Sequence, residues 1–170
     1  IQGQDNYQPA SSTKRIVSIV SSQTELLYYL GIQPLAQTIF CVHPKAFFKQ
    51  ATKIGGTKKL KIEKILALEP DLVLGNNEEN EQTQIEELAK HTDVWLSDIY
   101  TLKDAYDMIR TIGELTDCTL KANTLASTLE KGFKQLSFTS KSSVLYLIWK
   151  DPYMAAGRNT FINEMLEVLG

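Results

Sequence analysis

Short runs of consecutive apolar residues alternate along the chain with runs in which every third or fourth residue is apolar. The β-branched run at 16–20 predicts a buried strand, and the letters SQTE at 22–25 predict a capping box that begins a helix ending at Gly31. The same patterns predict further strands at 35–40, 71–75 and 94–96 and further helices at 62–68, 82–91 and 102–112. This alternation predicts an α/β lobe with a parallel sheet flanked by helices.

A second pattern begins after this lobe. Apolar residues at 117–136 form one stripe without proline, which predicts a connecting helix of about 30 Å. A polar break at 137–143 precedes a predicted strand at 144–148 and a predicted helix at 161–169. Because one strand and one helix cannot bury their own apolar faces, we expect them to be the first βα unit of a second α/β lobe whose remainder lies outside this chain.

The expected organisation therefore has four parts. Residues 1–14 are polar and lack apolar periodicity, which predicts a flexible tail. Residues 15–116 form the N-terminal lobe, 117–137 the connecting backbone helix, and 138–170 the start of the C-terminal lobe.

Composition narrows the possible functions. The net charge of −2 and the pI near 5.7 provide no basic stripe for a nucleic acid. No apolar run reaches the ~18 residues that a membrane-spanning helix needs. The two cysteines, Cys41 and Cys118, do not have the spacing of a zinc site. The sequence does not decide whether they form a disulfide.

Two candidate sites follow from the residues alone. Cys41 and His43 lie two apart in a loop after a strand, so an α/β enzyme with a thiolate–imidazole nucleophile is one alternative, although no orienting acid accompanies the pair. At the start of the first helix, backbone N–H groups can receive an oxygen of a ligand. The capping box accounts for its own first and last residues, which leaves the expected exposed neighbours Ser21 and Gln23 as candidate ligand contacts.

Several segments together resemble the periplasmic receptors of ABC importers for iron-siderophore, haem and corrinoid chelates, in which one long backbone helix joins two lobes. The segments are RIVS at 15–18, QTE at 23–25, LGI at 30–32, IGG at 54–56, IEKI at 62–65, ALEPDLV at 67–73, YMAAG at 153–157 and LEVLG at 166–170. Their order and spacing fit this class from Arg15 to Gly170.

The resemblance implies a binding protein and not an enzyme. Such a receptor captures a metal chelate in the cleft between its lobes and delivers it unchanged to an ABC permease, so it needs no cofactor and no metal ligands of its own. It works in the periplasm or another extracytoplasmic place, where a lipid anchor is an option. A chain with an incomplete second lobe is expected to bind cargo weakly or to associate with a second copy.

The resemblance also implies roles for particular residues. On the first lobe, His43 and Pro44 would line the cleft, and so would Thr57, which lies where vitamin B12 receptors commonly carry an aromatic residue; this difference disfavours a corrinoid. On the second lobe, the expected contacts are Trp149, Lys150, Tyr153 and Arg158, whose cations would neutralise an anionic chelate.

Each role has a structural alternative. Trp149 would otherwise pack beneath its loop, with the cations solvated. Glu63 opens a helix and would dock against an arginine of the permease, or it would only complement the helix dipole. The acidic run at 76–80 is interpreted as a solvated loop and not as a cation site. A third overall function, an interaction domain that keeps the receptor fold without a ligand, stays open.

Overall fold

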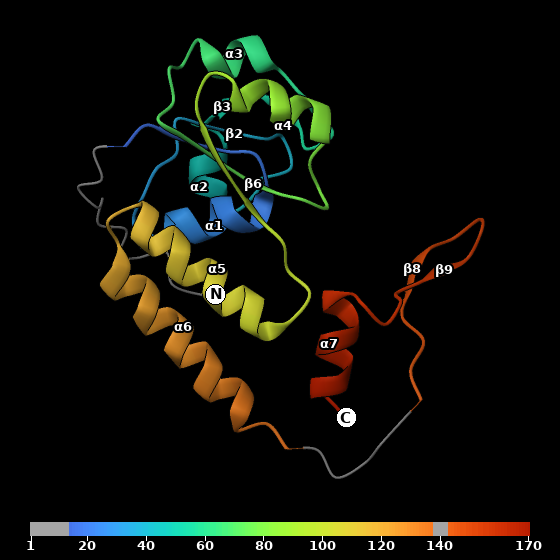
Figure 1. Cartoon of the computed structure of the whole chain (residues 1–170). Helices are drawn as coiled ribbons and strands as arrows, with labels where there is room; N and C mark the ends of the chain where they lie inside the picture. Colours follow the sequence, from blue (N-terminus) through green and yellow to red (C-terminus); the bar gives the residue numbers. More distant parts are fainter. Residues whose placement is uncertain (1–13, 138–142) are drawn as a thin grey trace. The chain divides into compact units, whose positions relative to one another are not determined.

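The computed structural model describes residues 14–137 and 143–170, which divide into two compact units (Figure 1). The first unit runs to Asp98 and includes Thr116–Cys118; the second comprises Ile99–Leu115 and Thr119–Gly170. Apart from Lys14, the predicted tail lies outside the described residues, as does most of the predicted polar break. The four predicted domain boundaries stay predictions.

A five-stranded sheet forms the centre of the first unit. Its strands are β1 (Ile16–Ser18), β2 (Ala36–Gln37), β3 (Thr52–Lys53), β6 (Leu72–Asn76) and β7 (Asp93–Ser97), in the order β3-β2-β1-β6-β7. All neighbours are parallel, and Val17 of β1 lies between Ala36 and Val73. The predicted α/β class with a parallel sheet is confirmed.

Helices cover both faces of this sheet, which explains why its central strands β1 and β6 are mostly apolar and buried. Figure 1 shows α3 (Ile62–Leu66) and α4 (Gln82–Ala89) on one side and α1 (Ser21–Leu30) on the other. The core between the layers is built from fully buried aliphatic side chains, including Val17, Ile54, Ile65, Val73 and Leu88.

Two short features of this unit were not predicted. The first is a hairpin of β4 (Gly55–Gly56) and β5 (Lys59–Leu60). Gly55 has φ of 99°, and a Cβ there would lie 2.3 Å from the Lys59 carbonyl oxygen, so only glycine fits. The second is strand β3, which could not be predicted because its two residues are too few to show an apolar periodicity. Helix α2 (Lys45–Phe48) follows the β2 loop.

The predicted capping box at 22–25 is wrong. Helix α1 begins at Ser21 and its N-cap residue is Val20, which has no side-chain cap. The hydroxyl of Thr24 instead donates a hydrogen bond to the Val20 carbonyl (2.9 Å). The connection from β1 is only two residues long, which places Ser22 inside the first turn. The predicted helix end is confirmed, because Gly31 adopts φ of 95° and its N–H bonds the Tyr28 carbonyl.

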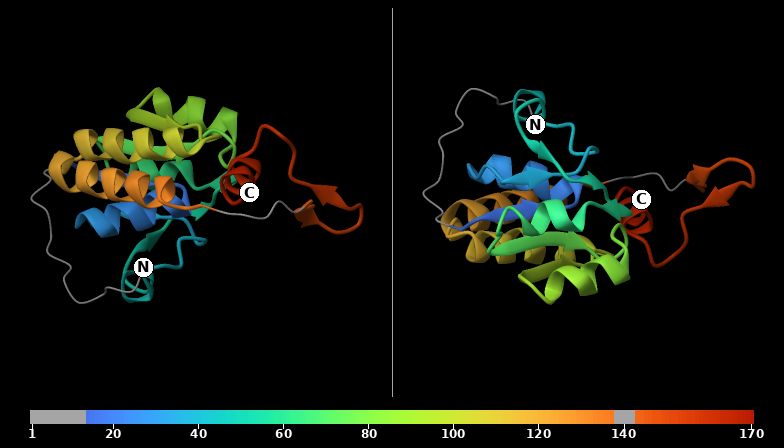
Figure 2. Two further views of the ribbon diagram at one scale, coloured as in Figure 1. Left: turned by 90° about the horizontal axis from the view of Figure 1, so that it is seen from below. Right: turned by 90° about the horizontal axis from the view of Figure 1, so that it is seen from above.

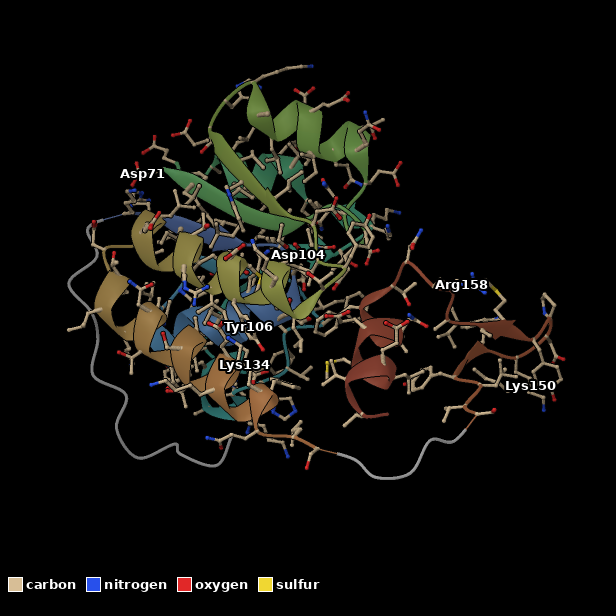
Figure 3. The ribbon with its side chains drawn as sticks, turned by 60° about the horizontal axis from the view of Figure 1, so that its bottom comes forward. Asp71, Asp104, Tyr106, Lys134, Lys150 and Arg158 are labelled. Atoms are coloured by element: carbon tan, nitrogen blue, oxygen red, sulfur yellow. The ribbon has the colours of Figure 1, made fainter. Side chains whose placement is uncertain are left out.

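Arg15 fastens the start of β1 to the turn that precedes β6. Its side-chain Nε and Nη2 donate to the carbonyl oxygens of Glu69 (2.9 Å) and Leu68 (2.6 Å). Its backbone N–H donates to Oδ2 of Asp71 (2.7 Å). Figure 3 labels Asp71 at this end of the sheet. Glu69 has φ of 46°, so these bonds satisfy the carbonyls of a left-handed turn.

The second unit contains α5 (Leu102–Leu115), α6 (Thr119–Lys134), the antiparallel strands β8 (Leu147–Trp149) and β9 (Met154–Ala155), and α7 (Phe161–Val168). Figure 2 shows α5 and α6 side by side. Asp117 lies between the two helices with φ of 58°, a left-handed conformation that cannot continue a helix. Helix α6 therefore begins two residues later than predicted. At 16 residues, α6 is about 24 Å long, shorter than predicted.

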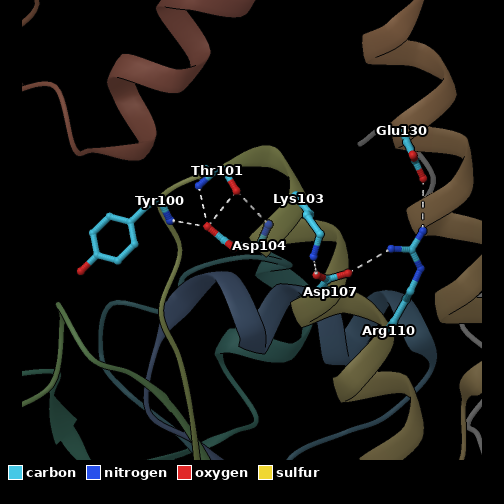
Figure 4. Close-up of polar contacts among 7 residues, drawn as sticks. All are labelled: Tyr100, Thr101, Lys103, Asp104, Asp107, Arg110 and Glu130. Atoms are coloured by element: carbon cyan, nitrogen blue, oxygen red, sulfur yellow. Dashed lines mark hydrogen bonds and ion pairs between the residues drawn. The ribbon is translucent and has the colours of Figure 1, made fainter.

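A capping box does form, at the start of α5 (Figure 4). The Asp104 Oδ2 atom accepts from the N–H of Thr101 (2.8 Å), while the Asp104 N–H donates to Oγ1 of Thr101 (3.1 Å). Hydrogen bonds from Thr101 are the main cause that lowers the pKa of Asp104 below its usual value, against the opposing effect of burial.

Replacing Asp104 by Ala is expected to destabilise the second unit by about 0.5–2 kcal/mol at neutral pH, because the first turn of α5 loses its reciprocal cap. Since the folded-state pKa is lowered, this contribution is present above the unfolded pKa of about 3.9 and is lost as the pH falls through the folded value. Thermal denaturation of both proteins between neutral and strongly acidic pH measures this. A pH-independent difference between the wild type and Asp104→Ala would contradict the cap.

Candidate ligand-binding site

The carboxyl ends of all five parallel strands lie at one edge of the sheet, which we name the carboxyl edge. The chain adds β2 and β3 on one side of β1 and then β6 and β7 on the other. The connection from β1 to β2 and the connection from β6 to β7 therefore run in opposite directions across the sheet. In open α/β sheets, ligands bind in the crevice at such a switch point.

Exposed apolar side chains follow β2 at this edge. The exposed fractions of Ile39, Phe40 and Val42 are 48%, 57% and 46%. The Ile39 N–H donates to the Gly55 carbonyl (2.9 Å), and the Phe40 ring packs on Gly56, where a Cβ would lie 3.0 Å from Phe40 Cε2. The hairpin thus supports a small apolar surface. Ile39 and Phe40 were not among the predicted ligand contacts, because both lie in the strand predicted at 35–40, whereas β2 ends at Gln37.

His43 and Pro44 continue the same loop. His43 is exposed, Pro44 is partly buried, and a cis peptide bond joins them. Thr57 is partly buried in the turn of the supporting hairpin. The structure therefore brings these three predicted contacts, together with Phe40, to the carboxyl edge of one unit.

Cys41 faces the interior. Its side chain is 1% exposed, and its Sγ lies 3.1 Å from each of the hydroxyl oxygens of Thr24 and Thr38. His43, by contrast, is exposed. A thiolate–imidazole nucleophile is not supported by this geometry. Cys41 and Cys118 are both free thiols, so the two do not form a disulfide.

The predicted exposure of Gln23 is wrong. Its side chain is fully buried, and its Nε2 donates to the Gly75 carbonyl (2.6 Å) and to Oγ of Ser97 (2.8 Å). Because α1 begins at Ser21, residue 23 faces the sheet and not the solvent. Gln23 therefore joins the ends of β6 and β7 and is not at the surface, whereas Ser21 is partly exposed at the carboxyl edge.

The loop after β6 is organised by its own amides. Oδ1 of Asn76 accepts from the N–H groups of Glu78 (2.9 Å) and Glu79 (3.1 Å), and Lys58 donates to the Glu78 carbonyl (2.7 Å). Burial raises the pKa of Glu79, although the positive charge of Lys58 opposes this. Among the described residues, no group of three His, Cys, Asp or Glu side chains could hold a metal ion.

In the second unit, the predicted contacts lie on and after the β8–β9 hairpin. Trp149 and Tyr153 are 63% and 69% exposed, so Trp149 does not pack beneath its loop. Lys150 and Arg158 are exposed as well, and Figure 3 shows Lys150 at the hairpin and Arg158 between the hairpin and α7. Asp151, with φ of 66°, makes the tight turn between the strands.

Two further features lie away from these residues. Glu63 is exposed in the first turn of α3, as either predicted role requires. In the second unit, a cavity of about 490 Å³ is lined by residues of α5, α6 and α7. Its cations Lys103, Arg110 and Lys134 are each paired with a carboxylate of Asp107 or Glu130 (Figure 4 shows the pairs of Lys103 and Arg110). Of these pairs, only the Arg110–Glu130 pair joins two helices, and none of the three cations that line this cavity lacks a carboxylate partner.

Known proteins identify the fold. The sequence pattern of the periplasmic binding protein family matches residues 16–170. The chain belongs to this family. It is 30% identical to the ABC transporter substrate-binding lipoprotein YvrC of Bacillus subtilis over 92% of this chain and 54% of that protein. It is 24% identical to the vitamin B12-binding protein of Salmonella typhimurium over 92% of this chain and 60% of that protein.

A solved structure gives the same picture. The periplasmic haem-binding protein HutB of Vibrio cholerae superimposes with a TM-score of 0.78 at 25% identity, covering 92% of this chain and 64% of that chain. The predicted resemblance is confirmed. The chain spans little more than half the length of the curated relatives it matches. None of the described helices is both long and apolar enough to cross a membrane.

Proposed function

We propose that this chain is the cargo-capturing part of an ABC importer's substrate-binding protein, which holds a metal chelate and passes it unchanged to the permease. The observation that carries this proposal is the exposed apolar surface of Ile39, Phe40 and Val42 at the carboxyl edge of a periplasmic binding protein fold. An apolar surface with few polar groups suits the large organic face of a chelate. Relatives that bind vitamin B12 or haem support the cargo class.

The second unit carries the other candidate contacts. Trp149 and Tyr153 offer exposed aromatic faces, and Lys150 and Arg158 would neutralise carboxylates or phosphates of the cargo. Glu63 would meet a cation of the permease. The lipoprotein relative supports an extracytoplasmic location, with a lipid anchor as the means of attachment. The metal would arrive inside its chelator, because the proposed site needs no metal ligands from the protein.

Binding of three chelates tests this function. The purified chain is titrated with haemin, cyanocobalamin and ferrichrome, and the bound fraction is measured by equilibrium dialysis and by quenching of Trp95 and Trp149. We expect saturable binding of one of the three, with the others weaker by tenfold or more. No binding of any of them would refute chelate capture and favour an interaction domain with the receptor fold.

We also expect the isolated chain to self-associate. The side chains of Val144, Leu145, Leu147 and Ile148 are 47–73% exposed, so β8 presents apolar residues on both faces. Exposed apolar surface of this kind drives association. Light scattering after gel filtration measures the mass, and Leu147→Lys should shift the chain toward the monomer. A monomeric wild-type chain at about 100 μM would contradict this expectation.

A further inference from the structure

Asn80 occupies the switch point between β1 and β6. Its side chain is 6% exposed, and its Nδ2 donates to the carbonyl oxygens of Ile19 (3.3 Å) and Thr57 (3.2 Å). Its Oδ1 accepts from the N–H of Asn76 (2.8 Å). One amide therefore joins the turn after β1, the turn of the β4–β5 hairpin and the end of β6.

Gly75 provides the space for this amide. A Cβ at Gly75 would lie 2.7 Å from Oδ1 of Asn80, 2.9 Å from Cδ2 of Leu96 and 3.0 Å from Cδ1 of Ile19. No side chain fits there without displacing Asn80 or the core. Because Gly75 has no side chain, the amide of Asn80 has room to lie against the end of β6.

A second amide supports the same strand end. Gln23 donates to the Gly75 carbonyl and to Ser97, and Nδ2 of Asn76 also donates to Oγ of Ser97 (3.1 Å). All of these groups are neutral. The amide donors are satisfied, whereas Oε1 of Gln23 is buried without a hydrogen-bond partner in the part of the chain that the structure describes. Satisfied buried donors favour this geometry, because moving them would leave each donor unpaired in the interior.

We propose that Asn80 is a positioning residue of the ligand-binding edge. Its hydrogen bond to the Thr57 carbonyl holds the β4–β5 hairpin against the end of β6. The hairpin in turn contacts the apolar surface, because the Phe40 ring packs on Gly56 and the Ile39 N–H donates to the Gly55 carbonyl. The apolar surface is therefore fixed before cargo arrives, which lowers the entropic cost of binding. This inference rests on the proposed function for the identity of the cargo, but the positioning itself does not.

Asn80→Asp tests the role with almost no change in size. The carboxylate still accepts from Asn76, but it loses both donors and places an oxygen against the carbonyls of Ile19 and Thr57. We expect backbone amide hydrogen exchange to accelerate at least tenfold at 19–24 and 55–60, with little change in β2, α5 and α6. The dissociation constant for whichever of haemin, cyanocobalamin or ferrichrome the wild type binds should rise at least tenfold.

Asn77→Asp is the matched control. It adds the same charge three residues away on an exposed side chain, and both measurements should stay at wild-type values. Exchange is measured without cargo, so a wild type that binds none of the three chelates refutes the proposed function while the positioning is still tested. Unchanged exchange in Asn80→Asp, or a uniform rise over the whole chain, overturns the positioning role. If Asn80→Asp does not fold, Asn80→Ser replaces it, with the same criteria.

Discussion

Replacing Gly75 by Ala is expected to destabilise the first unit by about 2–4 kcal/mol. Overpacking a tight interior site costs about 1–3 kcal/mol, and each hydrogen bond that a displaced Asn80 loses costs about 0.5–1.5 kcal/mol more. The added methyl would lie 2.7 Å from Oδ1 of Asn80 and 2.9 Å from Cδ2 of Leu96, which is partly buried against the core. Asn80 is 6% exposed and cannot move away without breaking its hydrogen bonds at the switch point.

Urea denaturation followed by tryptophan fluorescence measures this effect. In a Trp149→Phe background the signal comes from Trp95, which lies in β7 beside Leu74 and reports on the first unit. Gly132→Ala is the matched control, since a Cβ there meets nothing within 4 Å. Gly132 lies inside α6, so its replacement should stabilise the protein by up to about 1 kcal/mol. Equal effects of the two substitutions would show that Gly75 is not sterically required.

The sheet could be predicted because buried parallel strands leave a strong apolar signal. The prediction for β6 was 71–75 and the strand is Leu72–Asn76, while β7 extends one residue beyond its prediction at each end. The short strands β3, β4 and β5 have two residues each and exist only through pairing with distant segments. No local pattern could reveal them, since their hydrogen-bond partners are set by the tertiary fold.

The sequence could predict the location of a candidate contact only where the residue lies in a loop that directly follows a strand. His43 and Pro44 follow a strand, so their place at the carboxyl edge follows from topology. The prediction for Gln23 failed because the N-cap residue is Val20 and not Ser22, which places residue 23 in the first turn of the helix with its side chain against the sheet. The positioning role of Asn80 was invisible for another reason: a run of Asn and Glu is typical of a solvated loop, and only the fold places its last amide beneath two other turns.

Truncating Phe40 is expected to weaken cargo binding by about ten- to a hundredfold. Burying an aromatic side chain contributes about 1.5–3 kcal/mol, and each 1.4 kcal/mol is about tenfold in affinity. Because the ring is 57% exposed in the free protein, Phe40→Ala should change the free energy of unfolding little. Leu120→Ala is the control, since this side chain is 84% exposed on α6, and it should leave binding unchanged. Equilibrium dialysis with the chelate that the wild type binds measures both.

A second substitution shows whether the position of the ring matters as well as its presence. Gly56→Ala places a methyl 3.0 Å from Cε2 of Phe40, so the ring must shift by a few tenths of an ångström. We expect a smaller loss of affinity than in Phe40→Ala, and no further loss when Gly56→Ala is added to Phe40→Ala. This non-additivity is the signature of two residues that act through one contact. If Gly56→Ala weakened binding equally with and without the ring, the hairpin itself, and not Phe40, would be the surface that meets the cargo.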